Sequence, residues 1–105
     1  SGTVSQVGTA TIYINSKGDV CLVVTLKNTG ATTTVSSVYI DGQTVTASGD
    51  ITISPGTSTY SINLGSSLTG YLSGLAGSTI TLTLDLSSGT TVTVSAVVES
   101  GSPSS

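Results

Sequence analysis

Apolar and polar residues alternate with a period of two along most of the chain. The pattern is clearest at 79–86, where Ile80, Leu82, Leu84 and Leu86 alternate with threonines and one aspartate. Strands with one face in the core and the other in solvent produce this alternation. It recurs in six further segments: 9–14, 20–27, 38–40, 51–53, 60–64 and 91–98. We therefore predict about seven strands, and their register is strongly specified because a slip of one residue exchanges the buried and exposed faces.

Residues typical of tight turns separate these segments. Asp41-Gly42 lies between 38–40 and 43–45, and Asp-Gly readily adopts the positive φ angles of a two-residue hairpin. Short strands joined by such turns, in about 100 residues, indicate an all-β domain, an antiparallel immunoglobulin-like β-sandwich. The cysteine pair and tryptophan of antibody domains are absent, so the prediction concerns architecture alone. We expect one domain at residues 1–100 and a disordered tail at residues 101–105.

Helical spacing of apolar residues occurs once, in segment 68–77. The apolar residues are Leu68, Tyr71, Leu72 and Leu75, and Gly70, Gly74 and Gly77 interrupt them. Glycine weakens a helix, so a short helical turn or a packed loop is expected here rather than a full helix. Two interpretations follow: an apolar plug that closes one end of the sandwich, or a wall of a ligand pocket.

Charge is scarce, whereas hydroxyl groups are abundant. The chain has 20 serines and 20 threonines, but charged residues make up only 7% of it and its net charge is −3. Nucleic-acid binding requires several cations to neutralise phosphates, and only two lysines are present. The apolar run at 20–24 is far too short to span a membrane. This composition indicates an extracellular domain, and we expect the chain to be a mature domain or a soluble fragment separated from a targeting or anchoring segment.

The residues that catalysis requires are missing. A serine or threonine nucleophile needs a base, yet there is no histidine, and Lys17 and Lys27 lie at a turn and near a strand end. Asp41 and Asp50 lie at turns and Asp85 on the polar face of a strand, which favours roles in solubility or turn stabilisation. We therefore expect no enzymatic activity, no cofactor and no metal site.

A few apolar residues fall on strand faces that should be exposed. Cys21 and Val23 lie opposite Leu22 and Val24, and Cys21, the only cysteine, is expected to be buried and inert. Tyr39 and Val97 also have outward positions. Either the outer face is covered by other parts of the chain, or these residues form an apolar patch for a partner. We take Val23, Tyr39 and Val97 as the candidate interface residues.

Three segments carry a resemblance to a known group of proteins. They are GTATIYI at 8–14, VVTLKNTG at 23–30 and SSVYIDG at 36–42. Together they resemble the outer β-domain of archaeal pilins, flagellins and archaellum accessory proteins. In that group a strand ending in Asn-x-Gly, here at 28–30, precedes a hairpin of the form Val-Tyr-x-Asp-Gly, here at 38–42. The resemblance covers roughly residues 8 to 45.

The resemblance implies a structural role at the archaeal cell surface. Members of the group carry an N-terminal hydrophobic helix, which this chain lacks, so we expect that helix to have been removed. The asparagines at 15, 28 and 63 are not part of N-glycan acceptor sequences, which favours a stator-type accessory protein over a filament subunit. Such a protein, facing the pseudo-periplasm, associates with itself or anchors the filament to the surface-layer (S-layer) protein during motility. A pilin or flagellin subunit and a carbohydrate-binding adhesin are the alternatives.

Overall fold

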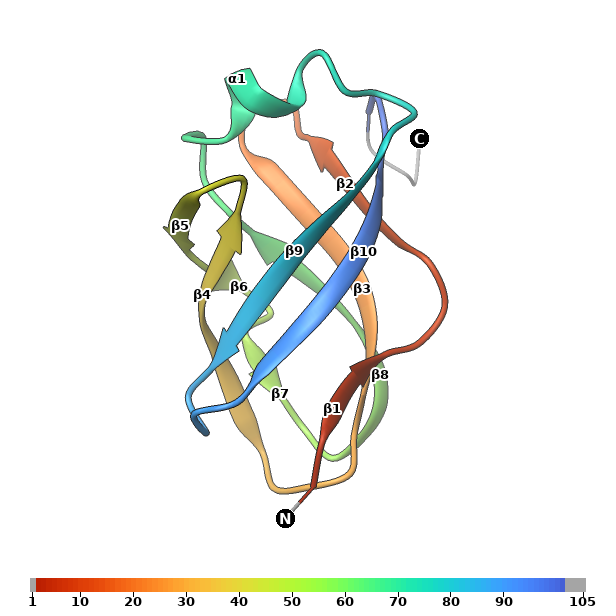
Figure 1. The fold of residues 1–105 in the computed structure, drawn as a ribbon, viewed down its shortest axis with the longest axis vertical. Coiled ribbons are helices and arrows are strands. Elements are labelled where there is room, and N and C mark those ends of the chain that lie inside the picture. The colour runs from red at the N-terminus through yellow and green to blue at the C-terminus, as the bar shows by residue number, and fades with distance from the viewer. Residues whose placement is uncertain (1, 102–105) are drawn as a thin grey trace.

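The computed structural model describes residues 2–101, which have an all-β fold (Figure 1). The strands are β1 (Val4–Gln6), β2 (Ala10–Ile14), β3 (Val20–Asn28), β4 (Thr33–Ile40), β5 (Gln43–Thr46), β6 (Ser48–Gly49), β7 (Thr52–Ile53), β8 (Gly56–Asn63), β9 (Thr79–Leu86) and β10 (Thr91–Val98). The prediction of an all-β protein is confirmed. Strands β1, β5 and β6 lie outside the seven predicted segments, and β1 and β6 are too short to give a period-two pattern. Apart from Gly101, the tail predicted at residues 101–105 lies outside the described residues.

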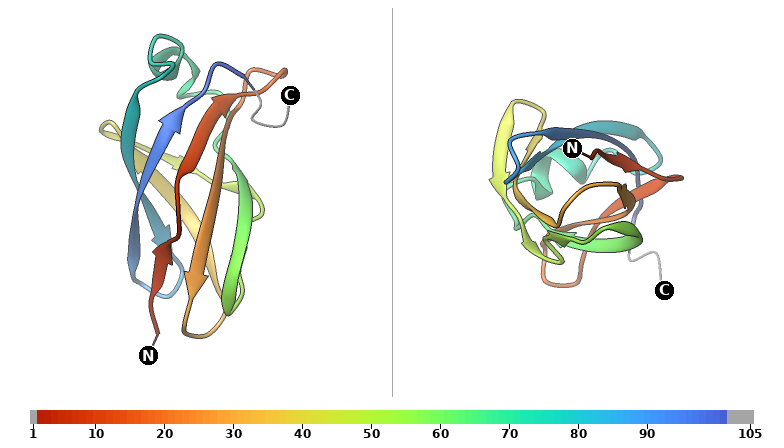
Figure 2. Two further views of the ribbon diagram at one scale, coloured as in Figure 1. Left: turned by 90° about the vertical axis from the view of Figure 1, so that its right-hand side faces the viewer. Right: turned by 90° about the horizontal axis from the view of Figure 1, so that it is seen from below.

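The strands form one continuous, barrel-like sheet in the order β5-β4-β9-β10-β2-β3-β8-β6. Strand β2 joins two parts of it, because β2 pairs in parallel with β10 and antiparallel with β3. On the other side, β6 pairs with β8 while β7, which follows shortly in the chain, pairs with β4. Seen from below, the strands surround the core (Figure 2). The two separate layers of the predicted sandwich are therefore not confirmed. Strand β2 on one side, and the β6–β7 segment on the other, bridge the positions where the layers would end.

The core contains the apolar faces that the alternation predicts. Buried residues of the predicted strands are Ala10, Ile12, Val20, Leu22, Val24, Leu26, Val38, Ile40, Ile53, Tyr60, Ile62, Leu64, Leu82, Leu84, Leu86, Val92, Val94, Ala96 and Val98. Ile14, Ile51 and Ile80 were expected in this set but are only partly buried. Full burial of one such side chain contributes about 1.5–3 kcal/mol, so this cluster can stabilise the fold without a disulfide.

Two turns have the geometry that their residues predict. Asp41 and Gly42 have φ angles of 49° and 78°, and Ile40 lies opposite Gln43, so β4 and β5 form a two-residue hairpin. This is the positive-φ pair that a type I′ turn requires. In the β2–β3 turn the side-chain oxygen of Asn15 accepts hydrogen bonds from the backbone N–H groups at 17 and 19. The β4–β5 hairpin fixes which backbone groups of β5 point toward β4 and which point away from it.

The helical spacing at 68–77 produces a single turn, α1 (Thr69–Leu72), at the upper end of the barrel (Figure 1). Leu68 and Leu72 are buried in the main core, and Tyr71 and Leu75 pack against it. The hydroxyl of Thr69 donates a hydrogen bond of 2.6 Å to the carbonyl of Gly18, which ties the turn to the β2–β3 loop. The expected short turn is confirmed, and its leucines close this end of the barrel. No helix in residues 2–101 has the length and apolar character needed to cross a bilayer.

A buried asparagine organises the lower end of the barrel. Asn28, at the end of β3, is 3% exposed. Its amide nitrogen donates to the carbonyls of Ala31 (2.9 Å) and Ile53 (3.2 Å), and its oxygen accepts from the N–H of Gly30 (2.8 Å). These bonds hold the β3–β4 turn against β7. The Asn-x-Gly pattern at 28–30 therefore has a structural role in this chain.

Candidate functional site

The polar side chains of the chain are engaged mainly in holding its own backbone. Asp85 accepts a hydrogen bond from the hydroxyl of Ser37 (2.9 Å), and Asp50 accepts one from the backbone N–H of Ser61 (3.2 Å). Among the described residues, every buried side-chain nitrogen and oxygen has a hydrogen-bond partner. The same residues contain no group of three or more potential metal ligands. Polar side chains among the described residues therefore do not single out a ligand site, whereas the outer surface of the sheet has exposed apolar residues.

Two of the three predicted interface residues lie in one row across the sheet. Val97 on β10 is the register partner of Thr11 on β2, and Thr11 is in turn the partner of Val23 on β3. We call Val97, Thr11 and Val23 the valine row. Adjacent strands are about 4.8 Å apart, so the two valines are about 10 Å apart on the outer face. All three residues are half-buried, so part of each side chain is accessible to a partner.

Tyr39 lies apart from the valine row, on β4. Its register partners are Thr44 on β5 and Thr83 on β9, and its side chain is 48% exposed. Thr83 is in turn paired with Thr93 of β10, so the tyrosine belongs to a row that is otherwise made of threonines. The structure thus divides the predicted interface into a valine pair and a separate exposed tyrosine.

Cys21 shows how part of the outer face is covered by the chain itself. It is 7% exposed, and its register partners on the two neighbouring strands are Tyr13 and Asn63. The amide of Asn15 lies 3.5 Å from its sulfur. The expectation that this cysteine is buried is confirmed. Of the two explanations for outward apolar residues, cover by the chain applies to Cys21. Val23 and Val97 are covered only in part.

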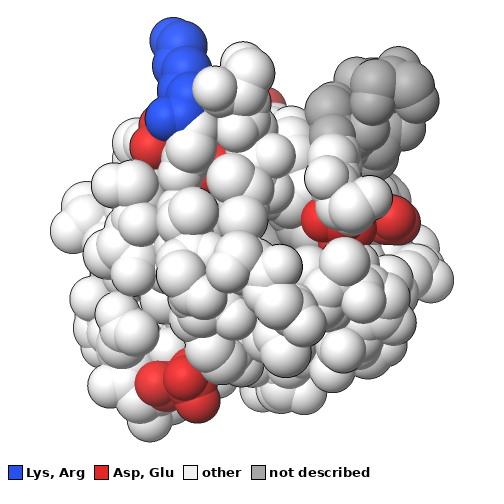
Figure 3. Space-filling view, turned by 90° about the horizontal axis from the view of Figure 1, so that it is seen from above, with Lys and Arg blue, Asp and Glu red and all other residues white. Residues whose placement is uncertain are grey.

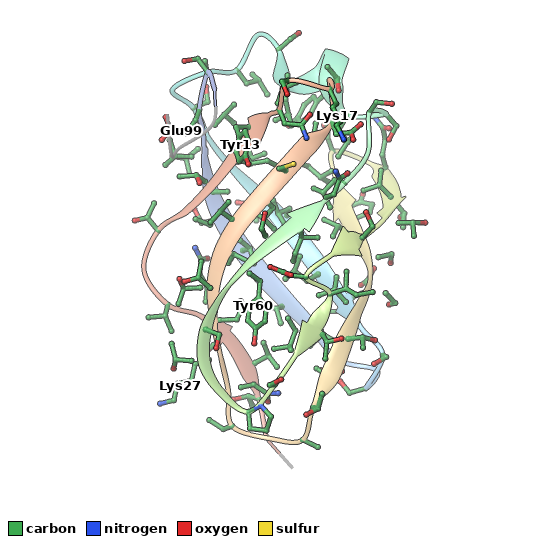
Figure 4. The ribbon with its side chains drawn as sticks, turned by 180° about the vertical axis from the view of Figure 1, so that it is seen from behind. Tyr13, Lys17, Lys27, Tyr60 and Glu99 are labelled. Carbon is green, nitrogen blue, oxygen red and sulfur yellow. The ribbon has the colours of Figure 1, made fainter. Side chains whose placement is uncertain are left out.

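The valine row has an apolar and an acidic neighbour that sequence reasoning missed. Val7, between β1 and β2, is 42% exposed, and its N–H donates to the carbonyl of Thr25, two residues from Val23. Tyr13 and Glu99 both lie near the upper end of the barrel (Figure 4), and each is two residues further along the chain than a member of the row, Thr11 and Val97 respectively. Val7 is not part of a period-two segment, so only the bend of the chain at this point reveals its exposure. Val7 and Tyr13 enlarge the partly exposed apolar surface around the valine row. Glu99 lies outside the row, which itself is uncharged.

Charged groups are sparse on the surface as a whole. At the upper end, lysine and acidic side chains are scattered over a largely uncharged surface (Figure 3). Lys17 and Lys27 are both exposed and lie far apart, near opposite ends of the barrel (Figure 4). The described surface therefore presents mainly hydroxyl, backbone and apolar groups.

Two shallow hollows lie outside the valine row. One, of about 260 Å³, is at the lower end and includes Val4, Asn28 and Thr90 in its lining; the other, of about 290 Å³, is lined by Asp50, Tyr60 and their neighbours. One polar residue in each lining is bonded internally, since Asn28 holds the β3–β4 turn and the hydroxyl of Tyr60 accepts from the N–H of Ser54.

Comparison with known proteins does not assign the chain to a family. No protein-family model matches the sequence, and no curated protein is significantly similar to it. The features of the chain that bear on function are the valine row and the resemblance of segment 8–45.

Proposed function

We propose that this chain is a non-catalytic structural domain of an archaeal cell-surface filament apparatus, of the accessory, stator-like kind. In this role the domain faces the cell exterior and associates with itself, anchors the filament to the surface-layer protein, or does both. The observation that carries the proposal is the valine row, in which two half-buried valines flank Thr11 on the outer face of a hydroxyl-rich, charge-poor sheet. The resemblance of segment 8–45 to archaellum accessory proteins supplies the biological setting.

We also propose that the barrel-like sheet is a closed variant of the immunoglobulin-like sandwich. The order β5-β4-β9-β10 matches the C′-C-F-G layer of variable-type domains, and β1-β3-β8-β6 matches the A-B-E-D layer. In this interpretation β2 is the segment that crosses from one layer to the other. Immunoglobulin-like domains at cell surfaces commonly act in recognition or assembly, which agrees with a structural role.

The valine row is small, so association through it alone would be weak. A stable protein interface buries roughly 1,200–2,000 Å² in total, more than three half-buried side chains supply. The interface must therefore extend to neighbours such as Val7 and Tyr13, and its affinity depends on many copies being present together, as in an envelope-bound apparatus.

The test is sedimentation velocity on the chain and on single variants at several concentrations. Val97→Lys places a charge in the valine row and is expected to shift the association to at least tenfold higher concentration. Val97→Thr keeps the shape of the side chain and is the variant to use if the lysine variant does not fold. Thr52→Lys adds the same charge on β7, on the opposite side of the barrel, and should sediment like the unmodified chain. Equal sedimentation of all variants, or an equal loss in Thr52→Lys, contradicts the proposal.

A further inference from the structure

Free backbone hydrogen-bonding groups lie along the outer edge of β5, the first strand of the sheet. Bonding alternates along an antiparallel pair, and the two-residue hairpin loop makes Gln43 and then Val45 the residues that bond to β4. The N–H and C=O groups of Thr44 and Thr46 consequently point away from the sheet. Both residues are exposed, and among the described residues β5 pairs with no strand other than β4.

A second set of free backbone groups lies on the lower half of β10. Even-numbered residues of this strand bond to β9, as the bonds at both of its ends show. Odd-numbered residues face the other way, and the N–H and C=O of Ser95 bond to the side-chain amide of Gln6, at 2.9 and 2.8 Å. Thr91 and Thr93 have the same orientation as Ser95 but lie where β10 diverges from β1 (Figure 1). Both are exposed, and the pairing of β10 with β2 among the described residues covers only positions 96 to 98.

These two edges terminate the same rows of the four-stranded part β5-β4-β9-β10. One row is Thr44, Tyr39, Thr83 and Thr93, and the next is Thr46, Ser37, Asp85 and Thr91. Each strand in this part runs antiparallel to its neighbour, so β5 and β10 run in opposite directions. A second copy placed beside β10 in the same orientation would therefore continue the antiparallel order without a break.

We propose that β10 of one copy pairs with β5 of the next, with Thr93 opposite Thr44 and Thr91 opposite Thr46. The free groups then form two hydrogen-bonded pairs, and the threonine rows continue from copy to copy. The contact joins two different edges, so a pair of copies still has one free edge of each kind, and growth gives a chain or a ring rather than a closed two-fold dimer. This inference rests on the proposed assembly function and assigns to it a contact distinct from the valine row.

The chemistry of the two edges favours a second copy as the partner strand. Neither β5 nor the free part of β10 contains a charged residue, and charges are the usual protection of an edge against pairing. The open edge of β8 at Thr57 and Thr59 lacks a matching edge, because β1, at the other end of β1-β3-β8, runs in the same direction as β8. A second copy added there in the same orientation would pair its β1 with β8 in parallel, which is the less stable arrangement.

The experiment is disulfide trapping in a Cys21→Ser background. The Thr44→Cys, Thr93→Cys double variant is oxidised at high concentration, and the products are separated on a non-reducing gel. Within one copy these positions are three strand spacings apart, about 14 Å, too far for a disulfide. Between paired copies they are opposite, about 5.5 Å apart, which a disulfide spans. We expect a ladder of dimer, trimer and higher species that collapses on reduction.

Three comparisons make the result decisive. The Thr44→Cys, Thr57→Cys variant places the second thiol on the β8 edge and is expected to give at least tenfold less ladder. Thr44→Cys alone should stay monomeric, and efficient dimerisation of it means two-fold β5–β5 pairing, which overturns the inference. Absence of a ladder from the folded double variant also overturns it. If the ladder is absent while Val97→Lys still abolishes association, only this inference fails; if the ladder forms and Val97→Lys has no effect, the valine row fails instead.

Discussion

Replacing Asn28 tests whether the lower end of the barrel depends on one buried amide. In Asn28→Ala the carbonyl of Ile53, a buried acceptor, loses the bond from this amide, and one such bond contributes about 0.5–1.5 kcal/mol. The N–H of Gly30 and the carbonyl of Ala31 lose part-buried bonds, but both groups border the lower hollow and can be reached by water. We therefore expect the free energy of unfolding to fall by about 2–4 kcal/mol in total, a large part of the usual 5–15 kcal/mol.

The assay is urea denaturation followed by circular dichroism, with the slope of unfolding compared between variants. Asn28→Asp keeps the shape of the side chain but directs a carboxylate oxygen at two carbonyl groups. At neutral pH its free energy of unfolding should fall by at least as much as that of the alanine variant. Gln43→Ala removes an exposed amide and should change stability by less than about 0.5 kcal/mol. If Asn28→Ala is as stable as Gln43→Ala, the structural role given to Asn28 is wrong, and its place in the Asn-x-Gly pattern needs another explanation.

Two further substitutions test the turn and the upper end of the barrel by the same denaturation assay. Gly42 has a φ of 78°, so Gly42→Ala forces a side chain into the left-handed region and should cost about 1 kcal/mol, whereas no loss of stability contradicts the type I′ turn. Leu72, the last residue of α1, is 2% exposed, so Leu72→Ala should cost about 2–5 kcal/mol; a loss below about 1 kcal/mol would show that α1 does not close the barrel.

Much of the local structure could be predicted from the sequence because it depends on local rules. Alternation places Leu82 and Leu84 in the core, and Asp41-Gly42 makes a hairpin, since both outcomes depend on residues close together in the chain. The closure of the sheet could not be predicted in this way. It depends on which edges β2 and the β6–β7 segment reach, and periodicity contains no information about pairing between distant strands.

The candidate site was predictable only in part for a related reason. Alternation identifies the outward apolar residues Val23, Tyr39 and Val97, but the register between strands decides which of them are neighbours. The parallel pairing of β2 with β10 brings the two valines into one row and leaves Tyr39 elsewhere. Similarly, the free edges of β5 and β10 depend on hydrogen bonding across the sheet, so side-chain patterns alone do not reveal them.

The central claim, that this domain works by self-association, is tested most directly by light scattering on the unmodified chain. Weight-average molar mass is measured over a concentration series at neutral pH and again near pH 3. The valine row and the free edges of β5 and β10 contain no ionisable side chain, so we predict that the mass rises above that of the monomer with concentration at both pH values. A molar mass that stays at 10.3 kDa at every concentration and at both pH values contradicts self-association through either surface.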